Sequence, residues 1–225
     1  MAHLAHYNEA HPLPFKITHW INLVAMVVLI FTGFIIHYPF IPAIMGVCRG
    51  MHIFCGFVLF INCMARVILA FIVKSAPTNG TRVQVLDYKT WLPQPDNKHQ
   101  GLAWIKYYLF LRKEMPLSAK LGVPQKISYL AIPLLIIIMF ITGVALWIPT
   151  SGPFTGLCIL VGGVMNMRII HYFLMFVFIA FFMLHAYLAS IEGSALIKVM
   201  FFGKETEGMH YDVERHNVIR TGEHE

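Results

Sequence analysis

Four long apolar blocks alternate with polar segments along the chain. Roughly 20 consecutive apolar residues cross the hydrocarbon core of a bilayer as an α-helix, and each block reaches that length. The blocks end at proline or charged residues, which disfavour an apolar helix continuing in lipid. The pattern predicts four transmembrane helices, at residues 17–38, 50–73, 126–148 and 167–191.

The predicted fold class is an all-α membrane protein, a bundle of four transmembrane helices. We expect an N-terminal arm at residues 1–16, a membrane domain at 17–192 and a C-terminal tail at 193–225. The first fourteen residues are polar and lack the apolar core of a cleavable signal sequence. The first apolar block is therefore expected to remain in the protein as a membrane span.

Composition supports a membrane protein and argues against a nucleic-acid partner. The 225 residues are 58% hydrophobic and 12% charged, whereas a soluble domain carries about 25% charged residues. The net charge is +6, but the basic residues are spread over particular loops and form no single patch. The expected partner of this surface is membrane lipid.

Basic residues also predict the topology. They concentrate in the arm, the tail and the long segment between the second and third spans, while the two short connections hold only Arg49 and Arg168. Cytoplasmic loops carry the excess of lysine and arginine. Both termini and the long loop are therefore predicted to be cytoplasmic.

Within the long loop, the stretch from Trp104 to Arg112 is both aromatic and basic. Two interpretations stay open for it. It is either a short amphipathic helix lying at the membrane interface or a packed loop helix with snorkelling lysines.

The cysteines predict no covalent chemistry. Three of the four lie in one stretch of the sequence around the second span, and no C-x-x-C-H motif for covalent haem attachment occurs. We interpret them as small apolar side chains. They are Cys48, Cys55, Cys63 and Cys158.

Histidines within the fourth span carry the main chemical prediction. His171 and His185 are fourteen residues apart, which is roughly 21 Å along a helix axis. Their net rotation about the axis is only about 40°, so both face the same side. One metal ion cannot bind both at that distance, whereas two haems stacked through the bilayer fit it.

Each haem needs a second axial ligand at matching depth. The first and second spans each supply one. His19 opens the first span at the level of His185, and His52 opens the second span at the level of His171. The predicted axial pairs are His19/His185 for an inner haem b and His52/His171 for an outer haem b. The alternative is buried histidines satisfied by hydrogen bonds, each of which would need its own buried partner. His37 is expected to be interfacial.

Three arginines are candidates for ion pairs with the haem propionates. Arg66 lies fourteen residues after His52, on nearly the same helix face but at cytoplasmic depth. Arg49 and Arg168 could serve the outer haem. The alternative is that these arginines only anchor helix ends at the interface.

The same two-residue motif occurs in the first and third spans. Thr32-Gly33 and Thr142-Gly143 occur in similar apolar surroundings. Gly33 and Gly143 could admit a flat ligand or a neighbouring helix close to the backbone. Helix packing alone also explains such pairs.

These elements resemble the four-helix, di-haem cytochrome b subunits of membrane-bound nickel–iron hydrogenases and formate dehydrogenases. The resemblance covers about Pro12 to Ser190, and the spacing in the fourth span and the His-Trp pair are its most specific parts. The matching elements are His19-Trp20, Thr32-Gly33, Arg49-Gly-Met-His52, Arg66, Thr142-Gly143, His171 and His185.

The resemblance implies an electron-transfer subunit of an oxidoreductase complex in a bacterial or archaeal cell (inner) membrane, with quinone reduction as its own chemistry. Electrons would pass from an iron–sulfur subunit, attached to the catalytic subunit, through the outer and then the inner haem to menaquinone or ubiquinone. Formate dehydrogenase relatives use an asparagine before the third span, where this chain has Gly122-Val-Pro-Gln125. The polar quinone candidates by position are Asn22, Gln125, Tyr129 and Glu192.

Three other functions stay open. A thiosulfate- or polysulfide-reductase anchor would oxidise quinol instead. A free-standing cytochrome of the b561 type would pass electrons between small molecules without a stable partner. A haem-free transporter or scaffold would show no Soret band.

Overall fold

The computed structural model describes residues 4–78, 80–92, 100–113, 116, 120–191, 194–212 and 217–220. The chain divides into two compact units. We call Thr18–Ala65 with Ile132–Leu188 the bundle unit, and Met1–Ile17 with Arg66–Ala131 and Ala189–Glu225 the arm unit.

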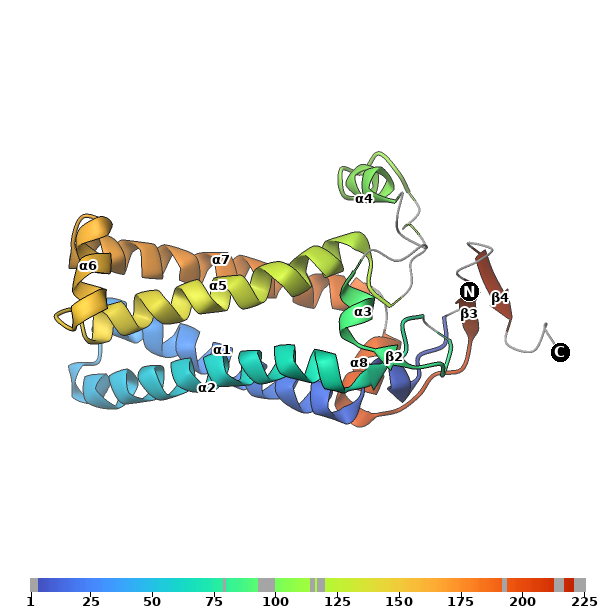
Figure 1. The fold of residues 1–225 in the computed structure, drawn as a ribbon, viewed down its shortest axis with the longest axis horizontal. Coiled ribbons are helices and arrows are strands. Elements are labelled where there is room, and N and C mark those ends of the chain that lie inside the picture. Colours follow the sequence, from blue (N-terminus) through green and yellow to red (C-terminus); the bar gives the residue numbers. More distant parts are fainter. Residues whose placement is uncertain are drawn as a thin grey trace. The chain divides into compact units, whose positions relative to one another are not determined.

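Four long apolar helices dominate the chain: α1 (Leu13–His37), α2 (Met45–Ile72), α5 (Val123–Trp147) and α7 (Val164–Ile191) (Figure 1). Each is long and apolar enough to cross a membrane, with a mean hydropathy between 2.2 and 2.6 in its most apolar window. The four predicted spans and the predicted helical fold class are confirmed.

Each long helix begins a few residues before its predicted start, and proline explains two of these differences. Pro14 and Pro124 stand inside the first turns of α1 and α5. The first amide groups of a helix have no partner within the helix, so a proline costs nothing there. Both prolines lie before the predicted starts of these spans, at residues 17 and 126.

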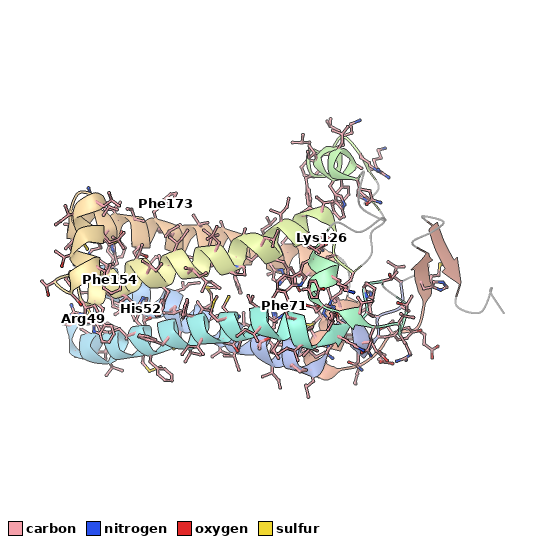
Figure 2. All side chains as sticks on the ribbon, in the orientation of Figure 1. Arg49, His52, Phe71, Lys126, Phe154 and Phe173 are labelled. Carbon is pink, nitrogen blue, oxygen red and sulfur yellow. The ribbon has the colours of Figure 1, made fainter. Side chains whose placement is uncertain are left out.

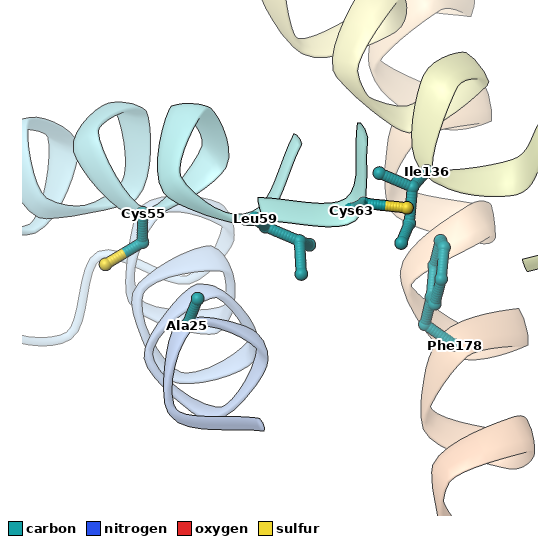
Figure 3. Close-up of a cluster of buried hydrophobic side chains, with 6 residues drawn as sticks. All are labelled: Ala25, Cys55, Leu59, Cys63, Ile136 and Phe178. Carbon is teal, nitrogen blue, oxygen red and sulfur yellow. The ribbon is translucent and has the colours of Figure 1, made fainter. Parts of the chain in front are cut away.

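The interior of the bundle unit is apolar and draws on all four long helices (Figure 3). Large apolar side chains such as Phe31, Phe54 and Phe173 are 70%, 64% and 65% exposed, which suits helices surrounded by lipid. All four cysteines are buried and free, so their interpretation as small apolar side chains is confirmed. The core residues are Ala25, Cys55, Leu59, Cys63, Ile136 and Phe178.

Short elements connect the helices of the bundle unit. The 3-10 helix η2 (Pro42–Ile44) joins α1 to α2, and α6 (Gly152–Leu160) joins α5 to α7. A second core cluster of Ala145, Cys158 and Met167 packs α6 against the two helices that it connects.

The arm unit collects the polar segments of the chain. The Ala5 amide donates to the Met209 carbonyl at 2.7 Å, so the N-terminal arm pairs with the C-terminal tail. This is the arrangement expected of segments on one side of a membrane. The short elements of this unit are η1 (Asn8–Ala10), β1 (Lys74–Ser75) antiparallel to β2 (Val85–Leu86), α3 (Tyr88–Trp91), α4 (Gly101–Tyr108), α8 (Ser194–Phe202), and β3 (Met209–Asp212) antiparallel to β4 (Asn217–Arg220).

Helix α4 contains the start of the aromatic and basic stretch. Trp104 is only 3% exposed, and its ring lies 2.6 Å from where a Cβ on Gly122 would stand. Leu102 and Ile105 are 63% and 56% exposed. The helix therefore packs through its tryptophan and leaves an apolar face uncovered, which combines features of both interpretations.

Candidate functional site

Two pairs of histidine rings from different helices lie close together within the bundle unit. His19 of α1 and His185 of α7 have ring centroids 6.1 Å apart. His52 of α2 and His171 of α7 have ring centroids 6.3 Å apart. The structure thus brings together the same partners that depth and topology predicted.

These distances suit a metal ion between the rings better than a hydrogen bond. A metal–imidazole bond is about 2.0 Å long and the ring centre lies about 1.1 Å behind the nitrogen, so two rings on opposite sides of one ion have centres about 6.2 Å apart. Two imidazoles joined by a hydrogen bond have centres only about 5 Å apart. The residues present therefore fit a bis-histidine haem.

Two histidines per pair are fewer protein ligands than a bare metal ion usually has. Among the residues that the structure describes, no group of three or more histidine, cysteine, aspartate or glutamate side chains could hold a metal ion. Two imidazoles per site are sufficient where a porphyrin supplies the remaining nitrogen ligands.

Threonine hydroxyls contact both rings of the His52/His171 pair. The Thr32 hydroxyl lies 2.9 Å from Nδ1 of His52, and the Thr142 hydroxyl lies 2.8 Å from Nδ1 of His171. With Nδ1 engaged, Nε2 is the nitrogen left for a ligand. Sequence reasoning noticed the repeated Thr-Gly pairs but missed the contact of their hydroxyls with the histidines.

The two glycines of these pairs lie against the same imidazoles. A Cβ on Gly143 would stand 3.2 Å from Cε1 of His171, and one on Gly33 would stand 3.5 Å from Cε1 of His52. The predicted close approach to the backbone therefore occurs. The group that approaches is the histidine side chain of the next long helix.

Aromatic rings surround the other pair. The His19 ring meets the Trp20 ring edge to face at 5.0 Å, and the His185 ring lies parallel to that of Phe181 at 6.2 Å. His37 is exposed and stacks on Tyr172 at 3.7 Å, which suits its predicted interfacial place.

Arg49 and Arg168 lie one helical turn before His52 and His171. Figure 2 shows Arg49 and His52 at the same end of α2. Both arginines are exposed, and neither forms an ion pair with any residue in the described ranges. Their role at propionates stays a prediction.

Arg66 has a protein partner that sequence reasoning missed. Its Nη2 lies 2.7 Å from Oδ2 of Asp87, and its guanidinium lies 3.8 Å above the Phe15 ring. Its Nη1 is buried and has no hydrogen-bond partner among the described residues. A propionate contact for Arg66 stays a prediction, now beside an established ion pair.

Asp87 is the centre of a buried polar network. Its other oxygen accepts from Lys120 at 2.9 Å and from the Ser75 hydroxyl at 2.6 Å. Burial alone would raise the pKa of the Asp87 carboxyl, but Lys120, Arg66 and the Ser75 hydrogen bond hold it below its ordinary value. Burial lowers the pKa of Lys120, against the opposing effect of Asp87.

Asn22, one of the quinone candidates, belongs to a polar pair inside the bundle unit. The Asn62 side-chain amide donates to Oδ1 of Asn22 and to the Thr18 carbonyl, both at 2.7 Å. Asn62 did not figure among the sequence candidates, because a single asparagine in a long apolar span shows no partner in the sequence.

Two of the other quinone candidates, Gln125 and Tyr129, belong to the arm unit. Gln125 accepts a hydrogen bond from the Gly122 amide, which is one half of a capping box at the start of α5. The Tyr129 ring centre lies 5.7 Å from the Arg66 guanidinium within the arm unit. Glu192 lies outside the described residues.

Comparison with known protein families identifies the family to which this chain belongs. A family model described as prokaryotic cytochrome b561 matches residues 10–203, a range that contains all four histidines of the two pairs and the whole of the four long helices. No curated protein matches the chain. Since the match covers most of the sequence, the chain belongs to the prokaryotic cytochrome b561 family, whose members are multi-pass membrane electron carriers that bind haem b.

Proposed function

We propose that the chain is the membrane-anchoring, di-haem subunit that passes electrons from an iron–sulfur subunit of a nickel–iron hydrogenase, or of a formate dehydrogenase, to a quinone. His19 with His185 and His52 with His171 would hold two haems b, which supply one-electron iron chemistry when bound. The observation that carries the proposal is the pair of ring separations, 6.1 Å and 6.3 Å.

The spacing of the two pairs supports electron transfer across the membrane. His171 and His185 are fourteen residues apart on α7, or roughly 21 Å along its axis. The hydrocarbon core is about 30 Å thick, so two carriers at these depths bring an electron within reach of both surfaces. A protein acting at one surface needs only one of them.

A quinone takes up two electrons and two protons, so its site needs polar groups at the edge of the membrane. Asn22 lies one turn from His19 on α1 and is paired with Asn62, which supports a quinone site beside the His19/His185 pair. Tyr129, Gln125 and Glu192 remain candidates. With the arm unit in the cytoplasm, as the positive-inside rule predicts, protons would come from the cytoplasm.

A free-standing carrier of the b561 type is the second candidate. The description of the matching family names a cytochrome of the b561 type, which suits this alternative. Mild solubilisation from the native membrane separates the two. An iron–sulfur protein that co-purifies with the chain supports the subunit, and migration of the chain alone supports the free-standing carrier.

Haem counting tests the ligand assignment. The wild type is expected to bind two haems per chain, and His171→Ala and His185→Ala to retain one each, since each removes an axial ligand from a different site. His37→Ala is the matched control and should retain two. Two haems in both His171→Ala and His185→Ala would refute the proposed pairs.

A further inference from the structure

Two threonines from different helices make the same contact with the two histidines of one pair. Thr32 and Thr142 are 8% and 7% exposed and lie 2.9 Å and 2.8 Å from Nδ1 of their histidines. Each threonine stands in the long helix that precedes its histidine in the sequence. The same contact between a threonine hydroxyl and a histidine Nδ1 therefore occurs twice around a single candidate haem.

The direction of these hydrogen bonds follows from the proton count. The Thr32 hydroxyl donates to the Val28 carbonyl at 2.7 Å, and the Thr142 hydroxyl to the Met139 carbonyl at 3.0 Å. A hydroxyl has one proton, so toward the ring it can only accept. Nδ1 must then carry the proton, and Nε2 keeps a lone pair for a metal ion.

The glycines that follow these threonines leave space for the same histidine rings. At Gly143 a Cβ would stand 3.2 Å from the His171 ring, and at Gly33 it would stand 3.4 Å from Sδ of Met175 and 3.5 Å from the His52 ring. The threonine therefore holds the ring nitrogen while the glycine leaves space for the ring. The His19/His185 pair meets the rings of Trp20 and Phe181.

We propose that Thr32 and Thr142 are positioning residues that fix the ligand tautomer of the His52/His171 haem and lower its reduction potential. This rests on the proposed function. A hydrogen bond from Nδ1–H to an oxygen makes an imidazole a stronger donor to its metal, and a stronger donor favours ferric over ferrous iron. The effect acts on one haem of the two, which helps electrons to leave the His52/His171 site for the His19/His185 site.

Redox titration of the detergent-solubilised holoprotein, followed in its visible haem bands, tests the proposal. Thr32→Val and Thr142→Val keep the side-chain shape but remove the acceptor. Each should shift the ferric–ferrous equilibrium of one haem toward ferrous, by up to about tenfold, which is about 59 mV for one electron. Thr32→Ser and Thr142→Ser keep the hydroxyl and should restore the wild-type value.

Thr155→Val is the matched control, because its hydroxyl contacts the Pro149 carbonyl and no histidine of the part of the chain that the structure describes. If a valine variant loses one haem instead, retention of that haem in the serine variant still supports the proposal. Unchanged midpoints in the Thr32→Val/Thr142→Val double variant would overturn it, as would equal shifts of both haems or valine and serine variants that behave alike. Failure of the axial pairs in the proposed function shows separately, as two haems retained in both His52→Ala and His171→Ala.

Discussion

Lys120 Nζ lies 2.9 Å from Oδ1 of Asp87, and their side chains are 3% and 0% exposed. The two residues stand in different parts of the long loop. Arg66 at 2.7 Å from the other carboxylate oxygen ties the same point to α2. One buried carboxylate thus joins separate parts of the long loop, for which the hydropathy pattern predicts no structure.

Asp87→Asn should be strongly destabilising. Removing one partner of a buried ion pair leaves the other charges uncompensated, at a cost of about 3–5 kcal/mol, and here two cations would remain. Thermal unfolding of the solubilised protein, followed by size-exclusion chromatography, measures the loss. Glu9→Gln is the control: Glu9 pairs with Arg82, which is 54% exposed and also binds Glu205, so little change is expected. Equal stability of the two variants would contradict a central role for Asp87.

Acid should loosen the N-terminal arm before it affects the bundle unit. Burial, with smaller contributions from Lys120, Lys16 and His6, lowers the pKa of His11 to about 3 against the opposing effect of Asp87. Since the unfolded pKa is about 6.5, the folded state resists protonation. Its contribution to stability is complete above about pH 6.5 and is lost as the pH falls toward 3.

Amide hydrogen exchange in the arm measures this effect. The Ala5 and His6 amides, bonded to the Met209 and Thr206 carbonyls, should exchange increasingly fast below about pH 6, after correction for the intrinsic rate. His11→Gln removes the titrating group and should flatten the dependence. An unchanged pH profile in that variant would assign the effect to another group.

The helices and the histidine partners could be predicted because they depend on regular quantities. Apolar length defines a membrane span, and a rise of about 1.5 Å per residue places His171 and His185 at two depths. Depth alone then selects His19 and His52 as the facing side chains. The ring separations of 6.1 Å and 6.3 Å confirm this proximity, although the binding of haem stays a prediction.

What the sequence did not reveal depends on how helices turn toward one another. The contacts of Thr32 with His52 and of Asn62 with Asn22 each join two helices, and their existence depends on helix rotation. Hydropathy says nothing about rotation when lipid and core are both apolar. Asp87 was missed for a related reason, since its partners lie far from it in the sequence.

The close approach of Gly143 to His171 predicts a graded response to added methyl groups. A Cβ at Gly143 would stand 3.2 Å from the ring, tighter than usual contact, whereas the nearest atom at Gly33 is 3.4 Å away and nothing lies within 4 Å of Gly56. Gly143→Ala should therefore move the imidazole by a few tenths of an ångström and lower haem retention. Gly33→Ala should have less effect and Gly56→Ala none, as measured by the haem to protein ratio after purification. A reversed order would refute the packing argument.

Phe178 should stabilise the bundle between the two candidate haem sites. It lies seven residues from His171 and seven from His185 on α7, is 4% exposed and packs in the core cluster with Cys63 and Ile136 (Figure 3). Phe178→Ala opens a cavity there and should cost about 3–5 kcal/mol, seen as a lower melting temperature of the solubilised protein. Phe173→Ala, on the same helix but 65% exposed, is the matched control and should unfold close to the wild type. Both variants should still bind two haems, because all four histidines remain.

A Phe178→Ala protein that is as stable as Phe173→Ala would show that the two sites are held apart by the helices alone, without a packed layer between them.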